Sequence, residues 1–140
     1  MRSARAGQRS VPELAFRDGV MDRIRLRESR YDEQAYLFVL SALEYTQAKL
    51  EARRHINAAE LATSCRELAL ERFGVMSRVV LERWGLRGTS DIGEVVFTLV
   101  ELGFLVKQPN DTREEFADLF DFETAFERDY PWDSSAVRLT

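Results

Sequence analysis

The stretch from Thr89 to Lys107 reads TSDIGEVVFTLVELGFLVK and decides the fold. Its pattern predicts a capped helix that ends before Gly103, because glycine readily adopts the left-handed conformation that closes a helix. The next residues, from Phe104 to Val106, are aromatic and β-branched or apolar, which favours extended chain. A helix that leads through Leu-Gly straight into a short strand is typical of the last helix and wing of a winged helix-turn-helix domain.

The residues after this strand are predicted to complete the wing. Four turn-forming residues from Gln108 to Asp111 suit a hairpin tip. Alternation then predicts a return strand from about Glu114 to Phe122, although the same phenylalanines also fit helical spacing. The expected fold is therefore mainly α with a small β-hairpin (α+β), a winged helix-turn-helix-like single domain.

The predicted helix from Asp91 to Leu102 carries an acidic stripe. Ser90 or Asp91 is expected to cap it, and its apolar residues recur at helical spacing on one face. Spacings of three, four and three residues place the following side chains on the exposed face: Asp91, Glu94, Thr98 and Glu101. Duplex DNA carries about one negative charge per 1.7 Å, so three carboxylates would repel it. The stripe is instead a candidate binding surface for a basic protein, or an acidic solvated face.

The middle of the chain predicts three further helices. Asp32 can cap a strongly apolar helix that continues to about Leu50 and forms the best candidate for the core. Asn57 followed by Glu60 reads as a capping box that starts a helix ending at Gly74. A short helix from Met76 to Trp84 should bury Val79, Val80 and Leu81. An edge strand is predicted from Arg53 to Ile56.

Charge is distributed unevenly along the chain. Residues 1–30 hold eight arginines against four acids, and residues 109–140 hold three arginines against nine acids. We expect a disordered basic tail over residues 1–11, a single winged-helix-like domain over residues 12–128 and a loose tail over residues 129–140. An amphipathic helix is predicted from Pro12 to Arg30.

Two function classes fit these patterns. The leading one is a non-enzymatic adaptor or regulatory module that binds a basic protein surface through its acidic helix and wing. The alternative is a nucleic-acid-binding regulator that uses arginines outside the usual recognition helix. Its candidate contacts are Arg23, Arg25, Arg27, Arg30, Arg53 and Arg54.

Composition argues against most enzyme classes. The chain has one cysteine, Cys65, expected to be an inert core thiol, and one histidine, His55. No metal cluster, glycine-rich phosphate loop or activated nucleophile is recognisable, so no cofactor is expected. No apolar run is long enough to span a membrane, and a cytoplasmic location is expected.

Several blocks together resemble a family of short, uncharacterised bacterial proteins over about residues 30–126. The blocks are Tyr36 to Leu40 with Leu43 to Thr46, Glu67 to Gly74, Trp84-Gly85 with Asp91 to Phe97, Leu102-Gly103, and Asp121 to Glu123 with Ala125-Phe126. The resemblance implies a complete, stand-alone protein. It implies no activity, and no functional residue is carried over from it.

Overall fold

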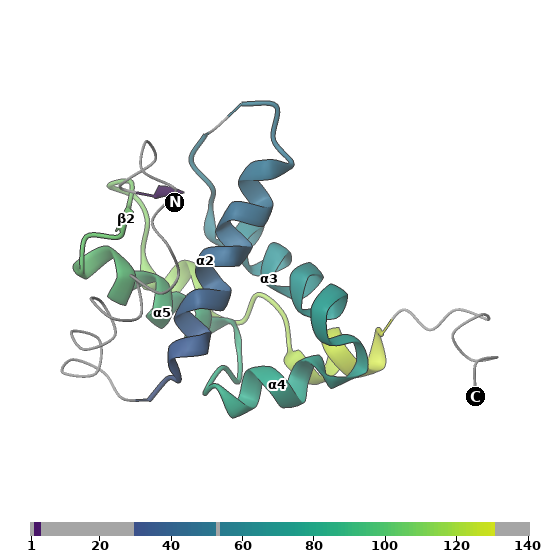
Figure 1. Cartoon of the computed structure of the whole chain (residues 1–140). Helices are drawn as coiled ribbons and strands as arrows, with labels where there is room; N and C mark the ends of the chain where they lie inside the picture. Colours follow the sequence, from purple (N-terminus) through teal and green to yellow (C-terminus); the bar gives the residue numbers. More distant parts are fainter. Residues whose placement is uncertain (1, 4–29, 53, 131–140) are drawn as a thin grey trace.

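The computed structural model describes residues 2–3, 30–52 and 54–130 and is mainly helical (Figure 1). The elements are β1 (Arg2–Ser3), α2 (Glu33–Ala48), α3 (Ala58–Phe73), the 3-10 turn η2 (Gly74–Met76), α4 (Ser77–Arg83), α5 (Thr89–Glu101), β2 (Leu105–Val106), the 3-10 turn η3 (Arg113–Phe116) and the π-helical turn η4 (Thr124–Arg128). The expectation of a mainly α protein is confirmed.

Helix α2 lies at the centre of the described residues and packs against both α3 and α5 (Figure 1). Its N-cap is Asp32, whose carboxylate accepts a hydrogen bond from the backbone N–H of Gln34 at 2.9 Å. Residues on most sides of the helix are buried, including Tyr36 and Val39, which are fully covered. The core position predicted for this apolar helix is thus confirmed.

Helix α3 begins with the predicted capping box, formed by Asn57 and Glu60, and ends at Gly74. The edge strand predicted before it is wrong, because residues 54–57 contain no strand. This segment instead inserts Ile56 into the core and is held at one point by the Gln47 side chain, which donates to the Arg54 carbonyl. Local sequence favoured extended chain, but no neighbouring strand lies beside it among the described residues.

Helix α4 is short, packs against α3 and is also contacted by η4. Ser77 and Leu81 are buried, and the Ser77 hydroxyl donates to the carbonyl of Ala69 at 2.9 Å. Val79 was predicted to point inward, but its side chain is 54% exposed. The contacts with α3 and η4 bury only part of this two-turn helix, so the adjacent valine remains outside.

Helix α5 begins two residues earlier than predicted. Gly88 occupies the N-cap position and no side chain caps the helix, so the prediction of a Ser90 or Asp91 cap is wrong. The C-terminal end follows the prediction: the helix stops at Glu101, and Gly103 has a φ of 85° before strand β2. Glycine tolerates this left-handed conformation at no steric cost.

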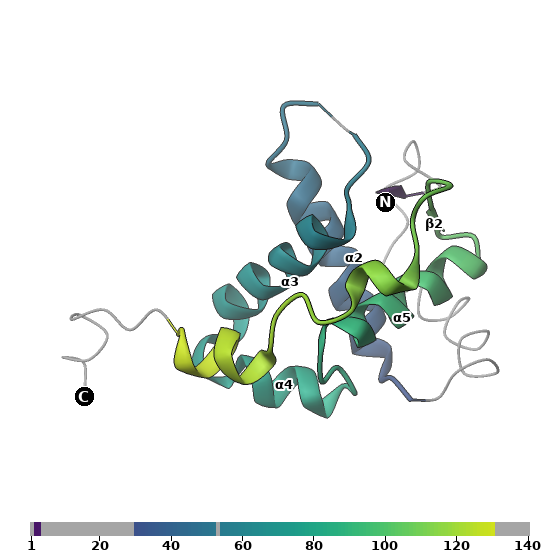
Figure 2. The ribbon, with the colours of Figure 1, turned by 180° about the vertical axis from the view of Figure 1, so that it is seen from behind.

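The chain after β2 departs most from the prediction. The return strand expected from about Glu114 to Phe122 does not form, since η3 and then an irregular segment occupy these residues. Strand β2 instead pairs antiparallel with β1, with Arg2 opposite Val106. Figure 2 shows the chain crossing α5 and reaching η4, which contacts α3 and α4. Burial of Phe116 against α5 requires this compact path.

Several predictions fall on residues outside the described part of the chain. They are residues 12–29 of the helix predicted from Pro12 to Arg30, nearly all of the basic tail and most of the C-terminal tail. The domain bounds that depend on those residues therefore stay predictions. Within the described residues, none of the helices combines the length and the apolar character needed to cross a membrane.

Candidate functional site

The acidic stripe of α5 is engaged with the rest of the structure. The Asp91 carboxylate accepts a hydrogen bond from the Tyr31 hydroxyl at 2.7 Å and another from the Arg87 backbone N–H at 2.9 Å. Burial raises the pKa of the Tyr31 hydroxyl above its ordinary value, and its hydrogen bond to Asp91 raises it further. Asp91 thus fixes the start of α5 against the start of α2 and is not a free surface carboxylate.

The other members of the stripe differ from one another. Glu94 and Glu101 both lie beside the Arg113 guanidinium of η3, at 3.4 and 3.7 Å. Thr98 is only 8% exposed, so its predicted place in a binding surface is wrong. Because η3 packs along α5, it brings a cation to the two glutamates. Of the four candidate residues, Glu101 is the most exposed.

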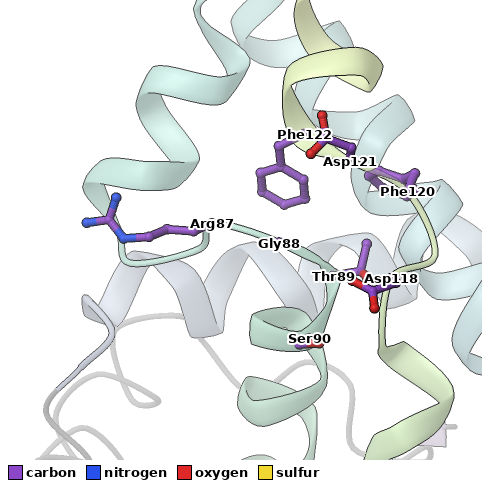
Figure 3. Close-up of a pocket in the computed structure, with 8 residues that line it drawn as sticks. All are labelled: Arg87, Gly88, Thr89, Ser90, Asp118, Phe120, Asp121 and Phe122. Carbon is purple, nitrogen blue, oxygen red and sulfur yellow. The ribbon is translucent and has the colours of Figure 1, made fainter.

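A pocket of about 300 Å³ lies where the start of α5 meets the segment between η3 and η4 (Figure 3). It is lined by Arg87, Gly88, Thr89, Ser90, Asp118, Phe120, Asp121 and Phe122. The Thr89 hydroxyl closes its inner side, since it donates to the Phe116 carbonyl and accepts from the Leu119 N–H. In Figure 3 the Arg87 side chain extends away from the other lining side chains.

Two carboxylates give this pocket its polar character. Asp118 is exposed, has a φ of 50° and makes no salt bridge among the described residues. Asp121 is exposed as well, and its carboxylate also accepts from the Thr124 N–H at 3.0 Å. Phe120 is partly exposed beside them. Sequence reasoning placed these residues on a strand, and the only signal of a site was the acidic composition of the region.

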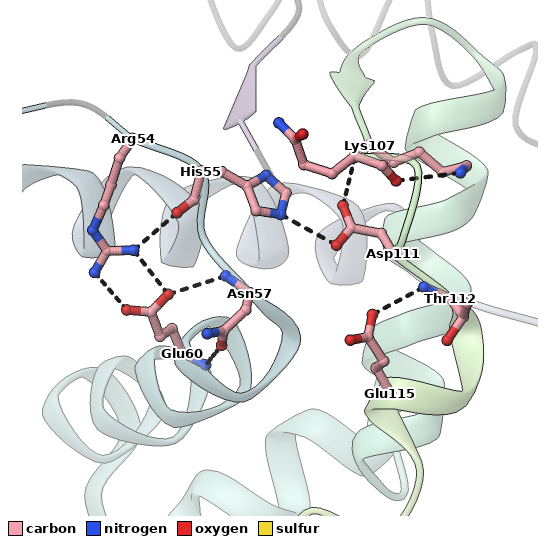
Figure 4. A network of polar contacts seen from close by, with 9 residues as sticks. Arg54, His55, Asn57, Glu60, Lys107, Asp111, Thr112 and Glu115 are labelled. Carbon is pink, nitrogen blue, oxygen red and sulfur yellow. Dashed lines mark hydrogen bonds and ion pairs between the residues drawn. The ribbon is translucent and has the colours of Figure 1, made fainter.

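A second polar cluster joins the α2–α3 connection to the turn after β2 (Figure 4). His55 Nε2 lies 3.2 Å from Asp111 Oδ1, and the other oxygen of Asp111 accepts from the Gln108 N–H. Asp111 was predicted to lie at the tip of a hairpin, and the structure buries it to 8% exposure. In the described residues no serine, threonine or cysteine hydrogen-bonds the imidazole, so the pair lacks a nucleophile. Its evident role is to hold the turn against α3.

Arg54, a candidate nucleic-acid contact, forms an ion pair within the same region of the structure. Its guanidinium forms two hydrogen bonds with the Glu60 carboxylate, at 2.6 and 3.1 Å, and Glu60 also accepts from the Asn57 N–H (Figure 4). Arg54 and then Asn57 lower the pKa of Glu60 to about 2. Arg30 lies 3.9 Å from Glu94. The remaining candidate arginines, Arg23, Arg25, Arg27 and Arg53, lie outside the described residues.

Replacing Glu60 with glutamine is expected to lower the free energy of unfolding at pH 7 by about 1 kcal/mol, a figure reduced for the exposure of the pair. The pKa of Glu60 is lower in the folded state, so its contribution is complete above about pH 4.5 and is lost as the pH falls toward 2. Urea unfolding followed by circular dichroism should show the two proteins converging over this range. Glu44→Gln, at an exposed helix position, is the control, and parallel pH profiles for Glu60→Gln and wild type would contradict the prediction.

The chain was also compared with known proteins. Protein-family models, curated proteins and solved structures give no match. The site must therefore be interpreted from its own chemistry. Within the described residues, no group of three or more histidine, cysteine or acidic side chains could hold a metal ion. Cys65 is buried, as predicted, and burial raises the pKa of its thiol to about 12.

Proposed function

We propose that this chain is a non-enzymatic protein-interaction module that binds a basic segment of a partner protein. The observation that carries the proposal is the pocket in which Asp118 and Asp121 lie beside Phe120, while the Arg87 side chain extends away. The acidic surface that we propose for partner binding therefore lies at the start of α5 and on the segment after η3. It does not lie along the middle of α5, where the sequence predicted it.

The chemistry of the pocket suits a lysine or arginine side chain. The two carboxylates can pair with the cation, and the phenylalanine ring can pack against the apolar stem or the charged group. A volume of about 300 Å³ is at the lower end of the range of ligand pockets, roughly 300–1,000 Å³. It accommodates one long side chain more readily than a large cofactor.

The surroundings of the pocket favour the same partner. Residues 109–130 contain eight carboxylates against two arginines. A field of this sign attracts a basic segment and raises its rate of association. The scaffold is proposed to be winged-helix-like, with α3, α4, α5 and β2 in the order of that fold, and the buried single cysteine suits the reducing cytoplasm.

Nucleic acid is less compatible with the described residues. Arg54 is paired with Glu60, and Arg30 lies close to Glu94, so neither is a free phosphate ligand. The face of α5 that would approach DNA is engaged by η3, whose Arg113 lies beside Glu94 and Glu101. A helix face engaged by another element of the same chain is not available to enter the major groove. Binding of a DNA duplex thus serves as a contrasting outcome of the test.

The proposal predicts that the double variant Asp118→Lys with Asp121→Lys binds a basic peptide at least about tenfold more weakly than wild type, because attraction becomes repulsion. The measurement is fluorescence anisotropy with a labelled peptide that alternates arginine and lysine with glycine, at physiological salt. A labelled DNA duplex is titrated in parallel.

A matched control separates local contact from net charge. Glu44→Lys with Glu51→Lys changes the total charge by the same amount at exposed positions on and after α2. This control should bind the peptide within about twofold of wild type. Equal weakening in both double variants, or preferential binding of the DNA duplex, would refute the proposed site.

A further inference from the structure

The pocket at the start of α5 combines an aromatic ring with two carboxylates. Phe120 lines it together with Asp118 and Asp121 (Figure 3). Among the described residues neither carboxylate forms a salt bridge. One oxygen of Asp121 accepts from the N–H and the hydroxyl of Thr124, at 3.0 and 3.3 Å. The other oxygen of Asp121 and both oxygens of Asp118 can therefore accept from a bound cation.

The chain holds a guanidinium with the same combination of groups elsewhere. The guanidinium carbon of Arg113 lies 5.1 Å from the centre of the Phe97 ring. Its nitrogens lie 3.4 Å from a carboxylate oxygen of Glu94 and 3.7 Å from one of Glu101. A guanidinium can contact a ring and two carboxylates at once, because it is flat and carries five N–H donors around its edge.

The chain holds an ammonium group in a different way. Lys49 Nζ lies 4.2 Å from the centre of the Tyr45 ring and 2.7 Å from one carboxylate, that of Glu67. The hydrogen bond to Glu67 raises the pKa of Lys49 above its usual value, and the Tyr45 side chain acts in the same direction. This cation is matched to one carboxylate and a tyrosine, whereas the pocket offers two carboxylates and a phenylalanine.

The Phe120 ring is held in position by other aromatic side chains. It stacks on Phe122, with the ring centres 6.0 Å apart and an angle of 24° between the planes. It also packs nearly perpendicular to Phe126, with the ring centres 6.4 Å apart. Both neighbours are buried. A ring that is already fixed loses little conformational freedom when a flat cation stacks on it.

We propose that the pocket binds arginine in preference to lysine and that Phe120 determines this specificity. The inference rests on the proposed function, the binding of a basic segment, and adds which cation that segment supplies. A guanidinium would stack on the Phe120 ring, donate a pair of hydrogen bonds to Asp118 and donate a further one to Asp121. An ammonium group carries the same charge, but it is more strongly hydrated and cannot form the flat, paired contact.

The test compares two labelled peptides of equal length and charge, one that alternates arginine with glycine and one that alternates lysine with glycine. Fluorescence anisotropy with the full-length chain at physiological salt should show about fivefold tighter binding of the arginine peptide, because the ammonium lacks the stacked contact. Long-range attraction is the same for both peptides, since their charges are equal. Affinities within about twofold of each other would overturn the proposal.

A conservative substitution tests whether the ring sets the preference. Phe120→Leu keeps an apolar side chain but removes the aromatic face, so the preference for arginine should fall below about twofold. Phe104→Leu is the matched control, since Phe104 is also partly exposed but does not line the pocket, and it should keep the wild-type preference. A retained preference in Phe120→Leu, or equal losses in the two variants, would show that Phe120 does not determine the specificity.

The outcomes distinguish this inference from the proposed function. If wild type binds both peptides equally and the double variant Asp118→Lys with Asp121→Lys binds both weakly, the site for a basic segment stands and the preference for arginine is refuted. If wild type binds neither peptide, both proposals are refuted. The comparison of the two peptides uses wild type alone, so it decides the matter even where a variant fails to fold.

Discussion

Replacing Phe116 by alanine is expected to lower the free energy of unfolding by about 3–5 kcal/mol, the range for large buried aromatic residues. Phe116 is 1% exposed and belongs to η3, which packs on both α5 and α3. Its ring lies against Gly93, where the absence of a side chain allows the close approach. Loss of the ring would leave a cavity between three elements that cannot readily collapse.

The measurement is urea unfolding at equilibrium, followed by far-UV circular dichroism. Leu119→Ala is the control, because Leu119 is 37% exposed and its truncation should cost less than about 1 kcal/mol. Loss of η3 packing should also disturb the neighbouring pocket, since the Thr89 hydroxyl donates to the Phe116 carbonyl. A loss of stability no greater than that of Leu119→Ala would show that Phe116 does not anchor this region.

Elements whose signals are local were predictable from the sequence. The capping box at Asn57 and Glu60 needs only residues three positions apart, and the stop at Gly103 needs only one glycine. The central position of α2 follows from a run too apolar to face water on any side. In each case the signal that decides the structure lies within a short stretch of sequence, so the local residue pattern is enough to predict the element.

The path after β2 could not be predicted in the same way. Alternating phenylalanines fit a strand as well as a turn, and the choice depends on where Phe116 finds a complementary surface. That surface is Gly93, 23 positions earlier in the chain. A strand would also need a partner beside β2, and the N-terminal residues Arg2 and Ser3 occupy that place.

The candidate site could not be predicted either, because it also depends on contacts between residues far apart in the sequence. Helical spacing placed Asp91 and Thr98 on an exposed face, but spacing cannot show that the Tyr31 hydroxyl donates to the first and that the second is buried. The acidic character of the C-terminal region was readable from composition. The pocket lined by Asp118 and Asp121 was not, because it exists only where that region folds back on the start of α5.

Replacing Gly93 by alanine is expected to lower the free energy of unfolding by about 2–3 kcal/mol, as overpacking of a core commonly does. Alanine in a helix interior is intrinsically better than glycine by roughly 1 kcal/mol, so the substitution should otherwise be stabilising. A Cβ at position 93, however, would lie 2.8 Å from the Cβ of Phe116 and 2.9 Å from its ring. The Phe116 Cβ is fixed by its own backbone, and rotation of the side chain cannot relieve the contact. Gly88→Ala is the control, because a Cβ there meets no atom within 4 Å; alanine is a poorer N-cap than glycine, so it should lower the free energy of unfolding by no more than about 1 kcal/mol.

The pair Gly93 and Phe116 also predicts the sign of a double-mutant cycle. In a Phe116→Gly background both the ring and the Cβ of residue 116 are gone, so the alanine introduced at position 93 meets neither contact and its helix propensity is no longer opposed. Gly93→Ala should then cost less than about 0.5 kcal/mol or become stabilising, which gives a coupling of about 2 kcal/mol between the two sites. Urea unfolding of all four proteins measures this coupling directly. Additive effects would mean that α5 and η3 do not meet at these residues, and the packing that positions the pocket would have to be different.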